Sequence, residues 1–211
     1  MSTTKNLDAT EYVFDAAEFV RAYSTTLGES SLATMSEHQL RVTAFCAECA
    51  EHQPLQHVNH TVTNKLTKAQ AILRAKLQLE EVLELIRGLG VGVRLAEGQP
   101  SDTNISIAGT DCLSFAADGE VNLKEIIDGL CDDSVIAKGT ASLLGIPLAP
   151  FEAPTDYNNL NKFKPGHYFR EDGKLVKPAD HPAPDLESVL SSITGGLTFA
   201  DFPNYKWSDV E

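Results

Sequence analysis

The sequence is poor in positive charge and has no long apolar run. Its 17 Lys and Arg residues stand against 30 Asp and Glu residues, which gives a formal net charge of -13. A surface of this sign repels nucleic-acid backbones, so a nucleic-acid polymer is not an expected partner. Neither a run of 18 apolar residues nor a basic-then-apolar leader is present, which predicts a cytoplasmic protein without a membrane partner. The four cysteines are too few for a disulfide scaffold.

Apolar periodicity predicts an all-α protein, an antiparallel helical bundle with a small β-hairpin insertion. Alternation of Ile105 and Ile107, and of Leu113 and Phe115, around Gly109-Thr110 predicts the hairpin. The Pro-, Asn- and Asp-rich stretch 146–185 predicts a long ordered loop. The predicted helices cover residues 12–23, 36–52, 66–89, 123–144 and 186–193.

We expect one domain, residues 1–211, made of three parts. Residues 1–65 hold the N-terminal helices, and residues 66–146 hold a helical core with the hairpin insertion. Residues 147–211 form a C-terminal wrap and an aromatic tail. Within the core, Asn122 is a predicted N-cap, with Glu125 at the capping-box position.

Two pairs of carboxylates carry the predicted chemistry. Glu81 and Glu84 share one face of the helix 66–89, and Glu125 and Asp128 share one face of the helix 123–144. Asp132 extends the second row by one turn. Antiparallel packing of the helices would bring these acids together, and such convergence makes physical sense mainly when cations neutralise it. The oxygen ligands favour Mg²⁺ or Mn²⁺.

Any single ExxE or ExxD match is usually a solvated helix face. Here the acidic face of the first helix continues a row that begins with Leu66, Leu73 and Leu77, which predicts partial burial of the acids. Buried charge without a partner is costly, so a metal site is the more economical interpretation.

Several segments together resemble a known family. LQLEEVLELIRGLGV (residues 77–91) and EIIDGLCDDSVIAKGTASLLGI (residues 125–146) resemble the two metal-binding helices of the MazG-like nucleoside triphosphate pyrophosphohydrolases. NLNK, REDGK and PAPDL, at residues 159–162, 170–174 and 182–186, resemble the C-terminal segment of phage members. The resemblance covers residues 66–186 apart from the hairpin, and these motifs occur in the family's order.

The resemblance implies an enzyme that converts a nucleoside triphosphate to the monophosphate and pyrophosphate with Mg²⁺ or Mn²⁺. It implies metal ligands at Glu81, Glu84, Glu125 and Asp128, with Glu80 or Asp132 as possible further ligands. A carboxylate, Glu80 or Glu81, then orients or deprotonates the attacking water. The residues implied to contact substrate are Asn159, Lys162, Lys174 and Lys177.

The phage members, including the MazZ branch, imply a purine deoxynucleotide, dGTP first, as the substrate. Asn158, Asn159 and Asn161 are candidates for contacts with the base, since strong rejection of an analogue needs polar groups that the analogue leaves unpaired. The family, together with apolar residues on more than one side of the helix 66–89, also implies a homodimer or homotetramer.

Three other interpretations stay open. Cys46 and Cys49, with His52, His57 and His60 nearby, could form a zinc site, although packed thiols on an amphipathic helix explain the same residues. The chain could instead be a non-enzymatic acidic helical protein whose aromatic tail docks on a partner. Phosphoribosyl-ATP pyrophosphohydrolase shares the fold and metal chemistry, but the phage-type C-terminal segment argues against it.

Overall fold

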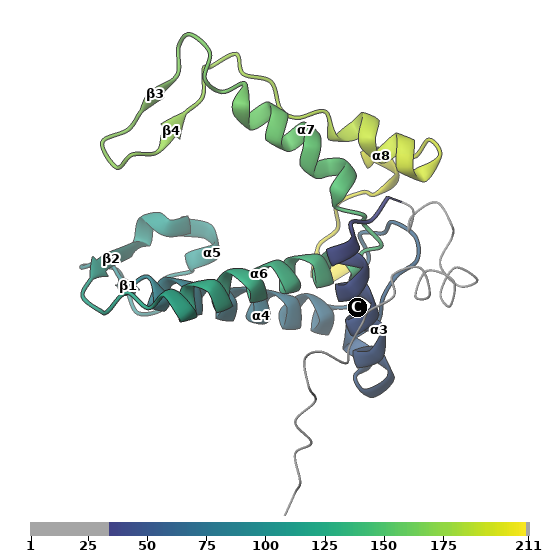
Figure 1. Cartoon of the computed structure of the whole chain (residues 1–211), viewed down its shortest axis with the longest axis horizontal. Helices are drawn as coiled ribbons and strands as arrows, with labels where there is room; N and C mark the ends of the chain where they lie inside the picture. Colours follow the sequence, from purple (N-terminus) through teal and green to yellow (C-terminus); the bar gives the residue numbers. More distant parts are fainter. Residues whose placement is uncertain (1–33, 210–211) are drawn as a thin grey trace, which may run out of the picture. The chain divides into compact units, whose positions relative to one another are not determined.

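The structure is a computed structural model that describes residues 34–209. It is mainly α-helical, as predicted, and two small antiparallel sheets accompany the helices (Figure 1). The predicted helix 12–23 lies outside the described residues. No helix within residues 34–209 is long and apolar enough to cross a membrane.

The chain divides into two compact units. The continuous unit is residues 69–137, and its ends fall inside the predicted core 66–146. The discontinuous unit combines the described residues before 69 with those from 138 onward.

The elements follow one another along the chain in this order: α3 (Glu37–His52), the 3-10 turn η1 (Pro54–Gln56), α4 (Lys68–Gly88), β1 (Val91–Leu95), α5 (Ile105–Ala108), η2 (Gly109–Cys112), β2 (Leu113–Ala117), α6 (Leu123–Leu143), α7 (Ala149–Leu160), β3 (Tyr168–Phe169), β4 (Leu175–Val176), α8 (Leu186–Thr194), η3 (Phe199–Asp201) and η4 (Trp207–Asp209).

Helix α3 anchors the core of the discontinuous unit. Ser36 caps it, because its side chain accepts a hydrogen bond from Gln39 N. The buried Gln39 side chain donates to Ile146 O (2.7 Å) and accepts from Leu148 N (2.8 Å), so one amide satisfies two backbone groups. The apolar residues buried in this core are Leu40, Val42, Cys46, Val58, Ala141 and Leu143.

The turn after α6 lies against the chain segment that precedes α4. Thr63 N donates to Leu144 O (2.9 Å), and Asn59 N donates to Ser142 O (3.2 Å). Gly145 has a φ of +65°, and a Cβ there would lie 2.2 Å from Thr61 O. Only glycine allows this close approach of two backbone segments.

A two-stranded antiparallel sheet is present in this region, but only its second strand was predicted, and Gly109 and Thr110, the expected turn, lie in η2 instead. Strand β2 pairs with β1, in the register Val91↔Ala117 to Leu95↔Leu113. The residues expected to form the first strand, 105–107, are instead helical in α5. Asn104 explains this, since its side chain accepts from Ser106 N and so caps a helical turn.

The predicted long loop 146–185 contains regular structure. Helix α7 covers Ala149–Leu160, and strands β3 and β4 form a second hairpin. Pro150 lies in the first turn of α7, where its missing N–H costs no hydrogen bond, and Pro154 gives up one bond within the helix. Composition therefore misled the prediction. Helix α8 begins and ends close to its predicted bounds, and Gly195 closes it in the left-handed conformation.

Candidate active site

Helices α4 and α6 of the continuous unit pack antiparallel and very closely. Contacts pair Gly88 with Ile126, and Leu85 with Gly129, so residue numbers rise along α4 as they fall along α6. A Cβ on Gly129 would lie 2.9 Å from Leu85 N, and a Cβ on Gly88 would lie 2.9 Å from Ile126 N. The two backbones therefore touch where glycine removes the side chain.

The face of α4 that meets α6 is largely polar. Its residues recur every three or four positions, which is the period of one helix face: Arg74, Gln78, Glu81, Leu85 and Gly88. The Gln78 side chain donates to Asp133 Oδ1, and the Arg74 guanidinium donates to Ile136 O. Arg74 is buried. The helix pair thus contains charged and amide groups where an apolar seam would be usual.

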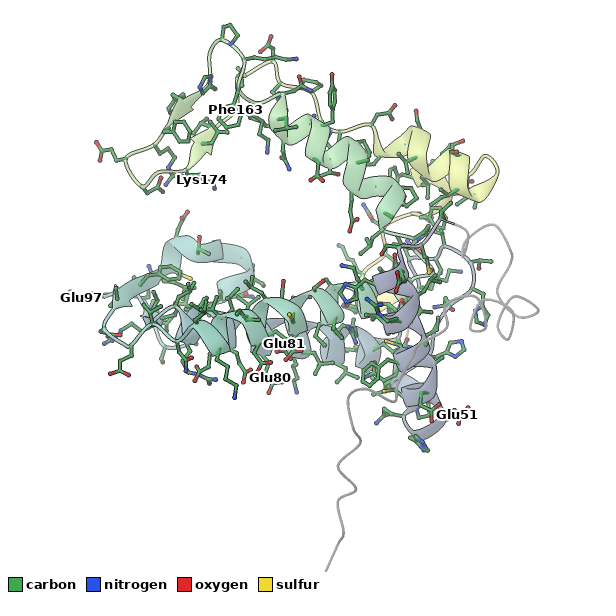
Figure 2. The ribbon with its side chains drawn as sticks, in the orientation of Figure 1. Glu51, Glu80, Glu81, Glu97, Phe163 and Lys174 are labelled. Atoms are coloured by element: carbon green, nitrogen blue, oxygen red, sulfur yellow. The ribbon has the colours of Figure 1, made fainter. Side chains whose placement is uncertain are left out.

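Glu81 lies at the centre of the predicted acidic cluster. Burial raises the pKa of its carboxyl group, and the negative charges of Asp132, Glu84, Glu80 and Asp128 raise it further, in that order. Glu81 and Glu84 are half-buried, and the other three are exposed. Charges from both α4 and α6 therefore act on Glu81, which lies beside Glu80 on α4 (Figure 2).

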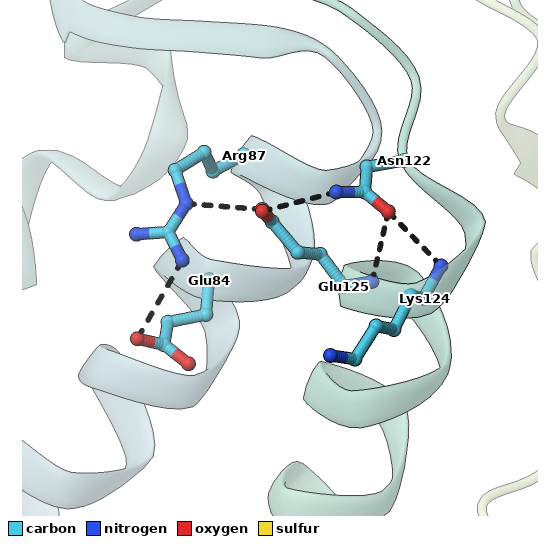
Figure 3. A network of polar contacts seen from close by, with 5 residues as sticks. All are labelled: Glu84, Arg87, Asn122, Lys124 and Glu125. Carbon is cyan, nitrogen blue, oxygen red and sulfur yellow. Dashed lines mark hydrogen bonds and ion pairs between the residues drawn. The ribbon is translucent and has the colours of Figure 1, made fainter.

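Glu125 does not contribute to the cluster around Glu81 in this arrangement. Its carboxylate accepts from Arg87 Nε (3.2 Å) and from the Asn122 side-chain amide (3.1 Å), as Figure 3 shows. Arg87 also pairs with Glu84 at 3.7 Å. One guanidinium thus lies between one acid from each predicted pair, where a cation is expected.

The predicted N-cap of α6 is present in a modified form. The Asn122 side chain accepts from Lys124 N (3.1 Å) and Glu125 N (3.4 Å), as an N-cap does (Figure 3). In a capping box, Glu125 would accept from the backbone N–H of Asn122. Here that N–H donates to Gly88 O (2.8 Å), which ties the start of α6 to the end of α4.

The carboxylates of the cluster are suitable ligands for a hard divalent ion, but their side chains are not arranged around a common point where an ion could bind. Carboxylate oxygens are the ligands that Mg²⁺ and Mn²⁺ prefer. Among residues 34–209, however, no group of three or more His, Cys, Asp or Glu side chains is arranged to hold a metal ion. Mutual repulsion of the acids and the position of Arg87 between Glu84 and Glu125 give a physical reason.

The predicted substrate residues belong to the discontinuous unit. Lys162 Nζ donates to Asn159 Oδ1 (2.5 Å), and Lys174 and Lys177 are exposed. The amides proposed for the base already have intramolecular partners. The side chain of Asn158 donates to Pro182 O (2.9 Å) and is 3.0 Å from His181 Nε2, and that of Asn161 donates to Tyr157 O (2.9 Å).

The candidate zinc residues do not form a metal-binding group either, within the described part of the chain. Cys46 is buried in the core of the discontinuous unit. Among residues 34–209, the buried Nδ1 of His60 has no hydrogen-bond partner. Burial, and then the charge of His57, lower the pKa of His60, so the fold favours its neutral form.

Sequence reasoning missed Arg74 and Arg87, which lie on α4 on either side of Glu81. Helical spacing could have identified Arg74, because it precedes Glu81 by seven residues and so lies on the same helix face. A pocket of about 400 Å³ adjoins Arg87, with Asp118, Asn122 and Glu125 in its lining.

No family model matches the chain, and no curated protein matches it significantly.

Proposed function

We propose that the chain is a metal-dependent nucleoside triphosphate pyrophosphohydrolase that releases a nucleoside monophosphate and pyrophosphate. The observation that carries the proposal is the acidic cluster itself: Glu81 is half-buried on α4 beside α6, and burial, and then four carboxylates from these two helices, raise its pKa. Isolated surface acids avoid such crowding, because like charges destabilise a helix pair. A site that neutralises a polyphosphate through divalent ions explains why these acids lie together.

The proposed ligands are Glu81, Glu84, Asp128 and Asp132, joined by Glu125. Mg²⁺ or Mn²⁺ bound there would screen the triphosphate and polarise its α-phosphorus. The chain itself supplies the base: Glu81, with its raised pKa, or the neighbouring Glu80 removes a proton from the attacking water. The water oxygen bonds to the α-phosphorus, the bond to the bridging oxygen breaks, and pyrophosphate leaves.

The proposed substrate is a purine deoxynucleotide, dGTP first, and the proposed phosphate contacts are Lys162, Lys174 and Lys177. Lysine fits this role because a compact ammonium pairs with phosphate as a point charge. Asn159 accepts a hydrogen bond from Lys162, so it lies beside one of the proposed phosphate contacts. The side-chain amides of Asn158 and Asn161 already form hydrogen bonds within the chain, so these residues are weaker candidates for hydrogen bonds to the base.

We further propose that two copies of the chain associate through α4 and α6. The polar face of α4 meets α6, and this leaves large apolar side chains exposed. The exposed set comprises Ile72, Leu79 and Leu83 on α4, and Leu123, Ile127 and Leu130 on α6. Several large apolar side chains exposed on two packed helices are typical of a subunit interface. A second copy of the chain exposes the same side chains, so two copies can bury them against each other symmetrically.

The function is tested by incubating the protein with each (d)NTP and Mg²⁺ or Mn²⁺ and resolving the products. Monophosphate and pyrophosphate are expected, and EDTA should abolish the reaction. Glu81→Gln should remove activity and leave the helical circular dichroism unchanged. Glu97→Gln is the matched control, because Glu97 is an exposed acid of the same unit outside the cluster (Figure 2). Release of orthophosphate and a diphosphate would contradict the proposal.

The assembly is tested by light scattering at micromolar concentration. A species at twice the chain mass of 22.9 kDa, or four times that mass, is expected. Leu83→Glu should shift it to the monomer, since the charge would be buried without a partner in the interface. A wild-type mass of 22.9 kDa would refute the association.

A further inference from the structure

Exposed aromatic rings form a row on the segment that contains β3 and β4. Phe163 and His167 meet edge to face with ring centres 5.6 Å apart, and His167 and Phe169 do so at 6.4 Å. Phe163 and Phe169 are each 58% exposed. Large apolar rings that stay in solvent as a contiguous group are typical of binding surfaces.

The backbone holds this row in place. Phe169 pairs with Leu175 across the hairpin, and Gly173, with a φ of +81°, closes the turn by donating to Arg170 O (2.9 Å). Lys164 O contacts both His167 N (3.1 Å) and His167 Nδ1 (2.8 Å). The imidazole between the two phenylalanines is therefore fixed by two contacts with one carbonyl.

The same segment has the opposite charge to the rest of the chain. Residues 162–177, here called the cationic hairpin, contain five Lys and Arg residues and two acids, a net charge of +3. The whole chain carries -13, so the remaining residues carry -16. Within residues 34–209, no hydrogen bond or ion pair engages the ammonium groups of Lys164, Lys174 and Lys177. Figure 2 labels Phe163 and Lys174.

We propose that the cationic hairpin binds a nucleoside triphosphate by stacking its base on the rings of Phe163 and Phe169, while nearby lysines meet its phosphates. The choice of ligand rests on the proposed function. The chemistry comes from the hairpin: exposed phenylalanine rings beside lysines complement a ligand that joins an aromatic ring to a polyanion. Phe163 and Phe169 then contribute to affinity for the base, apart from the carboxylates that carry the reaction.

Other occupants fit less well. A protein interface core is depleted of lysine, and the cationic hairpin is rich in it. A nucleic-acid strand or an anionic bilayer extends well beyond the hairpin and would meet the net charge of -16 on the other residues. A nucleotide is small enough to interact with the hairpin alone, since screening at physiological salt limits repulsion to a range of about 8 Å.

The test is a binding titration of the full chain with dGTP, dATP and dCTP in EDTA, where hydrolysis cannot proceed. Proton NMR follows the aromatic resonances, because a stacked base shifts them. Phe169→Leu should weaken nucleotide binding by about tenfold, the usual contribution of one base–aromatic stack. Phe115→Leu is the matched control, since Phe115 is 54% exposed and lies in the other unit, and it should bind like wild type.

Tripolyphosphate separates the ring contribution from the charge contribution. It should bind wild type and Phe169→Leu equally, whereas Lys174→Gln should weaken both tripolyphosphate and nucleotide binding. Equal nucleotide affinity in wild type and Phe169→Leu would overturn the proposal. So would tighter binding, per site, of a single-stranded oligonucleotide or of vesicles with anionic lipids.

The outcomes also distinguish this proposal from the enzymatic one. Nucleotide binding that depends on Phe169, without pyrophosphate release in Mn²⁺, would support the hairpin site and contradict the pyrophosphohydrolase. Pyrophosphate release with the same kcat/KM in wild type and Phe169→Leu would support the enzyme and contradict the hairpin site.

Discussion

Replacing Gly129 by alanine tests the close contact between α4 and α6. The new Cβ would lie 2.9 Å from Leu85 N and 3.0 Å from Leu85 Cα. Both atoms belong to the backbone of α4, so no side-chain rotation can relieve the overlap. The helices have to separate by a few tenths of an ångström or more, which also changes the spacing between Glu81 and Asp132.

The expected loss of stability follows from two opposing contributions. Glycine to alanine inside an exposed helix normally stabilises by about 1 kcal/mol. Overpacking a closely packed contact costs about 1–3 kcal/mol. The net expectation is a loss of about 1 kcal/mol, or a fall in Tm of about 2–4 °C for a chain of this length.

Thermal and urea unfolding in EDTA measure the effect of Gly129→Ala. Cys131→Ala is the matched control, because Cys131 is an exposed residue of the same helix and alanine has the higher helix propensity. The control should keep or slightly raise the stability of the protein. If Gly129→Ala instead stabilised the chain by about 1 kcal/mol, as at an open helical site, the helices would not touch there and the packing argument would be wrong.

Three further perturbations have defined outcomes. Arg87→Gln removes a cation that competes with Mn²⁺ for the acidic residues, so the Tm increase on adding Mn²⁺ should become larger. In EDTA the substitution should lower the free energy of unfolding by no more than about 1 kcal/mol, as for exposed ion pairs. Since burial lowers the pKa of His60, the folded state resists its protonation; the resulting stability is present above pH 6.5 and lost as the pH falls below it, and His60→Gln should weaken this dependence in urea unfolding. Tyr205→Phe removes the hydroxyl that donates to Asn64 O (3.1 Å) and should cost about 1 kcal/mol in the same measurement.

Each of the three has a control or a contradicting result. Arg94→Gln removes an exposed ion pair of the same unit, with Asp118, and should leave the Mn²⁺ response unchanged. A steeper loss of stability at acid pH in His60→Gln than in wild type would contradict the assigned cause. Unchanged urea unfolding of Tyr205→Phe would mean that the hydrogen bond of the hydroxyl contributes nothing to stability.

The sequence predicted α3, α4, α6 and α8, because apolar period and caps act locally, but it did not predict α5 or α7. Ser36, Asn122 and Asp185 each accept a hydrogen bond from a backbone N–H of the helix that follows, and α3, α6 and α8 begin next to them. The first strand of the hairpin was not predicted because the sequence analysis ended a helix at residue 89 and looked for strand alternation only on either side of Gly109-Thr110. The alternation of Val91, Val93 and Leu95 immediately after that helix was the neglected signal.

The candidate site was predicted in part. The spacing of Glu81 and Glu84 placed both on α4 near Asp128 and Asp132, because helical period fixes which residues share a face. The pairing of Glu125 with Arg87 was not predictable by that rule, since it depends on side-chain conformations across two helices. Apolar side chains usually fill the contact between two packed helices. Here the polar face of α4 meets α6, and Ile72, Leu79 and Leu83 of α4 are exposed.

The contacts of α3 have a consequence for synthesis of the chain. Gln39 bonds to Ile146 O and Leu148 N, and Thr43 is 2.7 Å from the Ser142 hydroxyl, across more than 90 intervening residues. A ribosome therefore has to translate the whole continuous unit before α3 meets its partners. Until then Leu40, Val42 and Cys46 remain open to solvent on the nascent chain. An interrupted translation product that ends before residue 142 would present this apolar face to chaperones and proteases.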